Sequence, residues 1–283
     1  MSTHTPASEA LPAVAGDGHR WTLLARIPAA PRQALLWLPA LGVAARHYLP
    51  LAEALAAQGV AVFLHEWRGN GSSALRPSRT QDWGYRQLLC EDLPASHAAI
   101  AQRAAVPLAI GGHSLGGQIA CCYAALHPRA FAQLWLVASG TPYWRQFAAP
   151  RRYLLPLAYR FLPWLAQRQG VLYGRRLGFG GTEARSLIAD WARVGLSNRY
   201  AAAGMAADLE ALLAQVTAPV RGVVLQDDWL APATSLRALL RKLAPRTLEL
   251  HSLDAAQLGA AADHFAWMKR PAAVAQALLG SAD

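Results

Sequence analysis

Cysteine, lysine and long apolar runs are all scarce in this chain of 283 residues. The three cysteines, Cys90, Cys121 and Cys122, are too few for a disulfide framework, and two of them are sequence neighbours. We therefore expect a reducing compartment and a cytoplasmic protein. No apolar run approaches the roughly 18 residues of a membrane-spanning helix. Residues 1–10 are polar and lack the basic start and apolar stretch of a secretory signal.

Acidic residues are also few, and the formal net charge is +10. Only two lysines contribute, so arginine carries the excess. Residues 141–205 contain ten arginines against Glu183 and Asp190, which concentrates the charge in one segment. The segment is broken by prolines and contains no helix-turn-helix, zinc-ligand or RNA-binding pattern, so nucleic-acid binding is not predicted. Metal-ligand spacings and phosphate-binding glycine loops are missing from the sequence, so no cofactor is predicted.

Apolar residues, in contrast, make up 54% of the chain, which predicts a large buried core. Short apolar runs alternate with segments of helical spacing. This alternation predicts an α/β fold with a mostly parallel central sheet and helices on both faces. The expected strands are 19–27, 34–38, 60–64, 107–111, 131–138, 220–226 and 247–251. The expected helices are 47–58, 84–103, 115–126, 233–243 and 271–279.

The same pattern divides the chain into three parts. Residues 1–17 are expected to be a loose N-terminal lead-in. Residues 18–140 and 206–283 are expected to form the α/β core. Residues 141–205, rich in aromatic residues, arginine and proline, are expected to form irregular short helices. They would be inserted over the functional edge of the sheet as a helical cap (lid).

A serine stands between small residues where an expected strand meets an expected helix. Gly112, Ser114 and Gly116 form a Gly-x-Ser-x-Gly pattern there. Small flanking residues let neighbouring chain pass close to a serine on a sharp turn. The helix that follows directs its N-terminal N–H groups at the site. Ser114 is therefore the candidate nucleophile, and an incidental serine on a glycine-rich turn is the alternative.

A serine nucleophile needs a histidine base and an orienting acid, and in such sheets the chain order is serine, acid, histidine. His251 and His264 are the histidines that follow a credible acid. His264 is favoured because it lies in an expected loop before the last helix. Asp227 or Asp228, directly after an expected strand, would be the acid. Two further aspartates compete for this role, Asp254 and Asp263.

An oxyanion intermediate needs two N–H donors. Leu115, after the serine, would supply one, and Leu41 in the loop after strand 34–38 is the candidate for the other. His113 and Trp229, next to the serine and the acid, are candidate pocket residues. Aromatic residues of the expected cap could line an apolar pocket or form the cap's own core. These are Tyr143, Trp144, Tyr153, Tyr159, Phe161, Trp164, Tyr173 and Phe179.

Taken together, the motifs resemble the α/β-hydrolase superfamily over roughly residues 21–279. Four stretches look like a bacterial branch of predicted hydrolases described as serine aminopeptidase-like. They are 38–43, 67–72, 112–117 and 227–232.

The resemblance implies a role for each candidate residue. Ser114 would be the nucleophile, His264 the base and Asp228 the acid, because the superfamily's acid commonly stands four positions before a proline. The N–H groups of Leu41 and Leu115 would form the oxyanion hole. One departure is the wide spacing between acid and base, with residues 255–262 as an extra loop.

Residues and resemblance together predict a cofactor-independent serine hydrolase. It would cleave a carboxylic ester, thioester or amide through an acyl-enzyme, with carboxylesterase-like activity on a medium-sized ester as the leading expectation. The substrate is expected to be a small molecule, which could be anionic because of the cap arginines. One alternative is an acyltransferase or thioesterase acting on an anionic carrier. Another is a non-catalytic binder of a small ligand.

One segment of the expected cap is apolar enough to bear on membrane contact. Residues 153–166 could rest on a membrane surface, but Pro156, Pro163 and Arg160 count against it. No stable membrane insertion is expected.

Overall fold

An eight-stranded sheet forms the centre of the computed structural model, which describes residues 7–280. Its strand order is β1-β2-β4-β3-β5-β6-β9-β10. Strand β2 runs antiparallel to β1 and β4, and the other neighbouring pairs are parallel, so the expected mostly parallel sheet is confirmed. The strands are β1 (Ala7–Val14), β2 (Arg20–Ile27), β3 (Gln33–Leu38), β4 (Val60–Leu64), β5 (Leu108–His113), β6 (Gln133–Val137), β9 (Val220–Leu225) and β10 (Leu248–Leu253).

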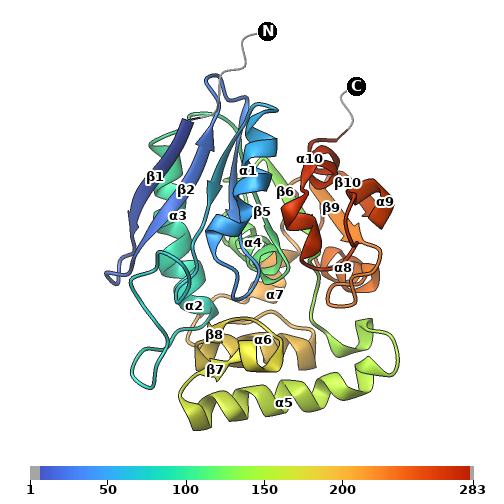
Figure 1. The fold of residues 1–283 in the computed structure, drawn as a ribbon. Coiled ribbons are helices and arrows are strands. Elements are labelled where there is room, and N and C mark those ends of the chain that lie inside the picture. Colours follow the sequence, from blue (N-terminus) through green and yellow to red (C-terminus); the bar gives the residue numbers. More distant parts are fainter. Residues whose placement is uncertain (1–6, 281–283) are drawn as a thin grey trace.

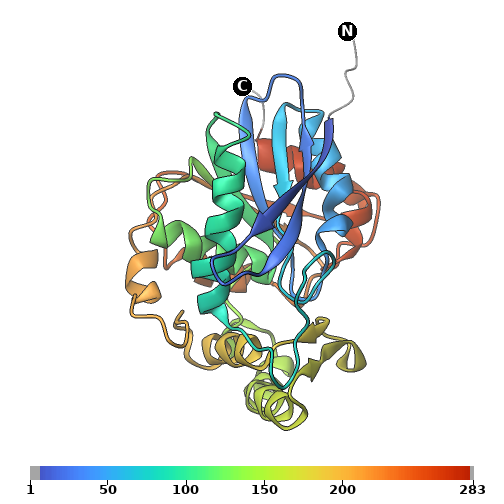
Figure 2. The ribbon, with the colours of Figure 1, turned by 90° about the vertical axis from the view of Figure 1, so that its left-hand side faces the viewer.

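Helices cover both faces of this sheet (Figures 1 and 2). One face carries α1 (Leu49–Ala56), α10 (Ala272–Leu279) and the 3-10 turn η5 (Ala266–Lys269). The other face carries α3 (Leu93–Ala101), α4 (Leu115–Leu126), α7 (Leu209–Leu213) and α8 (Ala233–Leu240). The side chains between the sheet and the helices form a separate apolar core on each face.

Strand β3 shows why the sequences of the central strands are uninterrupted apolar runs. Successive side chains of a strand point to opposite faces. Ala34, Leu36 and Leu38 pack into the core beneath α3 and α4, whereas Leu35 and Trp37 pack into the core beneath α1 and α10. Because both faces are covered, every position must be apolar.

The N-terminal segment differs from the expectation. Residues 7–14 of the expected loose lead-in form β1, which pairs along its length with β2 from Ala7–Ile27 to Val14–Arg20. Residues 1–6 lie outside the described residues. Strand β1 is an edge strand, and Pro12 is tolerated there because an edge strand has one row of N–H groups without a ladder partner.

The expected helix 84–103 is a continuous helical run with a local irregularity. It consists of α2 (Tyr85–Gln87), a π-helical turn η2 (Leu88–Asp92) and α3. Pro94 stands at the start of α3 and has no N–H to donate to a preceding carbonyl. The wider π turn lies directly before this proline, where the regular α-helical hydrogen bond is missing.

Residues 141–205, called the insert below, leave the sheet after β6 and contain one long helix rather than only short irregular ones. Helix α5 runs for 19 residues, from Arg151 to Gln169, through two internal prolines. Tyr159 of α5 packs edge-on against Trp191 of α6, and Gly195 leaves room for its ring. The elements of the insert are η3 (Trp144–Gln146), α5 (Arg151–Gln169), β7 (Leu172–Tyr173), η4 (Gly174–Leu177), β8 (Thr182–Glu183) and α6 (Arg185–Ser197).

The insert touches the core at the loop that follows β3. Gly42 has a positive φ of 73°, and a Cβ atom there would collide with the backbone of Gly180 and Gly181. The Gly181 N–H donates to the buried Glu183 carboxylate over 2.7 Å.

None of the helices in residues 7–280 combines the length and the apolar character that a membrane-spanning helix needs.

Glu183 makes the stability of this contact pH-dependent. Burial raises the pKa of Glu183 to about 7, against the opposing effects of the Gly181 N–H and the Arg175 charge. The folded state therefore holds this proton more tightly than the unfolded chain, whose carboxyl titrates near 4.5. The stabilising effect of the bound proton is lost as pH rises from about 4.5 to about 7. We expect Glu183→Gln, which still accepts the Gly181 N–H, to be more stable than wild type at pH 8 by on the order of 3 kcal/mol.

Denaturant unfolding at about pH 5 and pH 8 measures this difference. The gap between wild type and Glu183→Gln should widen with pH. Glu249→Gln, at a half-exposed carboxylate, serves as the control and should show no such widening. A constant gap for Glu183→Gln would contradict the account.

Candidate active site

Ser114 lies on the sharp turn between β5 and α4, as its pattern predicts. Its φ of 55° and ψ of −120° are strained for a residue with a side chain. A Cβ atom at Gly112 or Gly116 would collide with the backbone at Leu38, the end of β3. The Ser114 N–H donates to Val137 O over 3.1 Å, which fixes the turn against β6. The two glycines thus allow β3 to approach the turn closely, and the turn holds the serine side chain at the edge of the sheet.

His264 and Asp228 meet although 36 residues separate them. The His264 Nδ1 lies 2.7 Å from Asp228 Oδ2, and both side chains are buried. The other carboxylate oxygen of Asp228 accepts the N–H groups of Leu230 at 2.8 Å and Ala231 at 3.1 Å. The carboxylate is therefore fixed by the backbone on one side and faces the imidazole with the other.

The segment between acid and base is folded, which explains how the wide spacing is accommodated. Residues 255–258 form the short helix α9 (Ala255–Leu258), capped by Asp254. The Asp227 N–H then donates to Ala262 O over 3.0 Å. This bond brings the chain back beside the end of β9, so that His264 reaches Asp228.

The competing acids and base do not take part in this pairing. Asp227 is exposed. Asp254 accepts the N–H of Gln257 at the start of α9, and Asp263 accepts two N–H groups at the start of η5. His251 lies on β10 and lines a separate cavity from His264.

The loop after β3 is held by two side chains from other elements. The Ala40 N–H donates to the Tyr48 hydroxyl over 2.9 Å, and Trp67 Nε1 donates to Pro39 O over 2.8 Å. Because the Ala40 N–H is occupied, Leu41 is the next residue whose N–H could serve an oxyanion. Leu41 and Leu115 both line the cavity that contains Ser114.

His113, expected as a pocket residue, is fully buried behind His264 and does not line the cavity. Its ring centroid lies 4.6 Å from that of His264. Burial, with a smaller effect of the neighbouring His264, lowers the pKa of His113 well below its usual value, so the ring stays neutral. Burial also raises the pKa of Tyr48, which remains a phenol. Its hydroxyl accepts the Ala40 N–H and forms a 2.8 Å hydrogen bond with His113 Nδ1.

Tyr48 therefore links the β3 loop to the ring that packs on His264. A second aromatic residue, Trp267, donates its Nε1–H to His264 O over 3.0 Å and packs against His113. Neither residue is evident from a sequence motif, because the contacts of both with His113 join segments that are far apart in the sequence.

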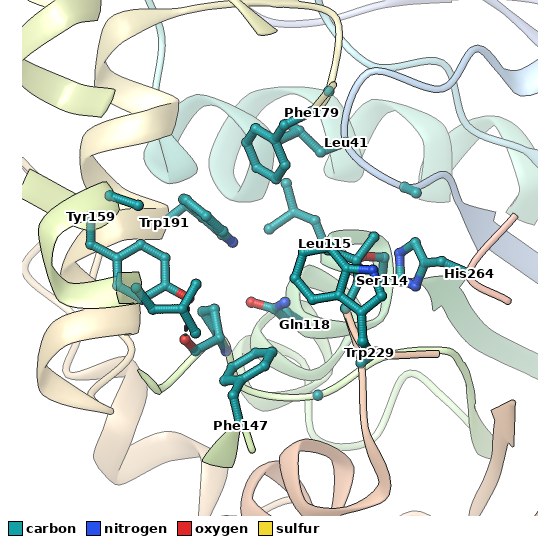
Figure 3. A pocket seen from close by; sticks show the side chains of 18 of the residues that line it. Leu41, Ser114, Leu115, Gln118, Phe147, Tyr159, Phe179, Trp191, Trp229 and His264 are labelled. Carbon is teal, nitrogen blue, oxygen red and sulfur yellow. Dashed lines mark hydrogen bonds between the residues drawn. The ribbon is translucent and has the colours of Figure 1, made fainter. Parts of the chain in front are cut away.

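An apolar cavity of about 220 Å³ lies between the sheet edge and the insert (Figure 3). Ser114 and His264 stand side by side at one end, and Tyr159 and Trp191 stand at the other. Of the expected pocket residues, Trp229, Tyr159 and Phe179 line it. The remaining lining is mostly aliphatic, with Gln118 as a polar exception.

The other expected pocket aromatics are not among the lining residues. Tyr143 and Trp144 are half-buried and pack against each other at the start of the insert. The remaining four are exposed by 42% to 59%, namely Tyr153, Phe161, Trp164 and Tyr173. They therefore form neither a cavity wall nor a core of the insert.

A second hydrogen-bonded group of a serine, a histidine and an aspartate lies away from the cavity. Ser73 Oγ and Asp92 Oδ1 are each 2.9 Å from a nitrogen of His19. All three are buried, and Arg68 forms a 2.7 Å ion pair with Asp92. None of them lines the cavity at Ser114. These hydrogen bonds connect the loop after β4 to the start of β2 and to η2, which is a structural role.

Comparison with known proteins agrees with this architecture. A family model described as serine aminopeptidase, S33 matches residues 29–257. No curated protein matches the chain.

Several solved structures are similar over most of the chain. A hydrolase from Pseudomonas aeruginosa PA01 is 19% identical, with a TM-score of 0.61 over 96% of this chain and 99% of that one. A thermophilic esterase from Thermogutta terrifontis is 17% identical, with a TM-score of 0.60 over 96% and 97%. The thioesterase domain from the curacin biosynthetic pathway is 19% identical, with a TM-score of 0.57 over 96% and 99%. At these identities the likeness shows the fold, an α/β-hydrolase fold.

Proposed function

Because the chain belongs to the serine aminopeptidase S33 family of α/β hydrolases, we propose that it is a serine hydrolase that cleaves carboxylic esters with apolar acyl groups. The observation that carries the proposal is the paired His264 and Asp228, 2.7 Å apart, beside a serine on a strained turn at the end of an apolar cavity. A nucleophile, a base and an orienting acid at one end of one cavity are what acyl transfer requires.

The proposed reaction has two halves. Ser114 Oγ attacks the ester carbonyl carbon while His264 Nε2 takes the hydroxyl proton, and Asp228 stabilises the imidazolium. The tetrahedral intermediate collapses, the imidazolium protonates the leaving alkoxide, and the acyl group stays on Ser114. Water then attacks the acyl-enzyme with His264 as base, which releases a carboxylic acid and restores Ser114.

Within the described residues the Ser114 hydroxyl makes no hydrogen bond. Catalytic hydrogen bonds are often long without substrate and tighten in the complex. The Leu41 and Leu115 N–H groups would stabilise the oxyanion. Tyr48 and His113 would act as positioning residues, since they support the Leu41 loop and the His264 ring.

The lining of the cavity favours a neutral apolar acyl group. Among the described residues that line it, none is an arginine, lysine, aspartate or glutamate. The arginines of the insert therefore do not hold an anionic group within this cavity, so the acyl group that it takes is expected to be uncharged. The insert would act as a cap that sets acyl-chain length, because Leu155, Ala158 and Leu162 of α5 form one wall.

A size-altering substitution in this wall tests the acyl assignment. We expect Ala158→Phe to lower kcat/KM for an octanoate ester by about tenfold or more, and to change it little for an acetate ester. Leu157→Phe, on the exposed side of the same helix, is the matched control. Equal losses on both esters, or none on either, would contradict the assignment of the cavity. No turnover of any ester by the folded wild type would favour the binder alternative.

A further inference from the structure

Helix α5 carries large apolar side chains on the side that faces away from the cavity. Their exposed fractions lie between 50% and 65%. We call this set the outer face: Tyr153, Leu154, Leu157, Phe161 and Trp164. Exposed apolar residues are common singly, but five on one helix face form a patch that needs a partner.

The spacing of these residues places them on one stripe. At about 100° per residue, the outer face covers an arc of roughly 100° along three turns of the helix. The opposite side of α5 carries Leu155, Tyr159 and Leu162, which line the cavity. The outer face is therefore not needed for the packing of the insert, and Figure 1 shows α5 along the outer edge of the molecule, far from the termini.

The charge around the outer face has one sign. Arg160 and Arg168 of α5 are exposed, and residues 141–182 contain no aspartate or glutamate. Arg152 lies 4.7 Å from the ring of Tyr153, and Arg168 lies 5.7 Å from the ring of Trp164. Aromatic rings and arginine heads thus occur together along the stripe.

We propose that the outer face of α5 docks the protein on an anionic lipid surface. A helix with a large apolar stripe, aromatic residues and arginines lies in the plane of a membrane interface, where its rings enter the boundary and its cations meet anionic headgroups. Pro156 and Pro163 do not oppose this, because α5 is continuous through both. Arg160 does not oppose it either, because an exposed arginine can lay its stem along the apolar surface and keep its charged head among the headgroups. If the proposed esterase function also holds, the acyl cavity lies one helix away from the lipid.

A second copy of this chain fits the outer face less well. A symmetric dimer brings the same patch of each subunit together. Two outer faces would then set arginines against arginines, with no carboxylate from residues 141–182 between them. A lipid headgroup phosphate supplies the missing negative charge.

Vesicle flotation tests the proposal without any turnover. We expect wild type and Ser114→Ala to float with vesicles of phosphatidylcholine and phosphatidylglycerol in equal parts, and much less with phosphatidylcholine alone. Binding should weaken at high salt. The double variant Phe161→Asp, Trp164→Asp should lower the vesicle affinity by about tenfold or more. The control is Leu248→Asp, Leu250→Asp, which changes two exposed leucines of the edge strand β10.

Thermal unfolding of each variant establishes that it is folded, and the result does not depend on whether the protein hydrolyses esters. The proposal is overturned if wild type does not float with the anionic vesicles, or if the control and the α5 variant lose binding alike. Equal flotation with both vesicle types would also overturn the proposal, because it assigns anionic headgroups to the arginines. A dimer in solution that the α5 variant splits would assign the outer face to a second copy.

Discussion

Replacement of Ser114 by alanine is expected to lower kcat on a cleavable ester by on the order of 10⁴-fold or more. The substitution removes the oxygen that would form the acyl-enzyme, and the base and acid then have no nucleophile to activate. The strained φ of 55° is shared by serine and alanine, so the folded state should be nearly as stable as before. Initial rates on a short-chain ester measure the effect, with thermal unfolding as the check on folding.

Ser73 provides the matched control for this substitution. It also lies beside a histidine that faces an aspartate, but it is buried away from the cavity. Ser73→Ala should lower stability, because the His19 ring and nearby N–H groups lose a partner, and should leave kcat nearly unchanged. A loss of turnover in Ser73→Ala and not in Ser114→Ala would reverse the assignment.

Asp228→Asn is expected to lower kcat by roughly 10⁴-fold while the fold stays intact. Asp228 Oδ1 accepts two backbone N–H groups, and the asparagine oxygen would keep those bonds. Its amide NH₂ would then face His264 Nδ1 in place of the carboxylate oxygen at 2.7 Å. This arrangement favours the tautomer with the proton on Nε2, so the nitrogen facing Ser114 can no longer accept a proton.

Asp227 provides the matched control for Asp228→Asn, because its replacement removes the same charge without touching His264. Asp227 is exposed, and its backbone, not its carboxylate, ties the chain to Ala262. Asp227→Asn should therefore change kcat by no more than about twofold. Comparable losses in the two variants would show that the pairing of Asp228 with His264 is not what supports turnover.

The core of the fold could be predicted because its strands are buried on both faces. Runs such as Val60–Leu64 and Leu134–Val137 contain only apolar residues, as expected of strands that are covered on both faces. Strand β1 escaped prediction because it lies at the sheet edge, is mostly exposed and contains Pro12. Residues 141–205 are expected to form irregular short helices, whereas α5 runs through Pro156 and Pro163. Contacts of Tyr159 with Trp191 of α6 and with Pro142 O hold this helix in the insert.

The residues of the candidate site differ in how far local patterns identify them. Ser114 has a motif because its turn demands glycines at fixed positions. Asp228 and His264 follow from strand ends and chain order, whereas their approach depends on the fold of α9, which no spacing reveals. Tyr48 reaches His113 across 65 residues, a contact that only the packing of η1 (Ala45–Tyr48) against β5 creates.

Labelling with a fluorophosphonate, read by intact mass, tests the central claim most directly, because the reagent reacts with an activated serine whatever the natural substrate. The account predicts one adduct on the wild type, one on Ser73→Ala, and none on Ser114→Ala. An adduct that persists on Ser114→Ala, or no adduct on folded wild type, would contradict the assignment of Ser114 as an activated nucleophile.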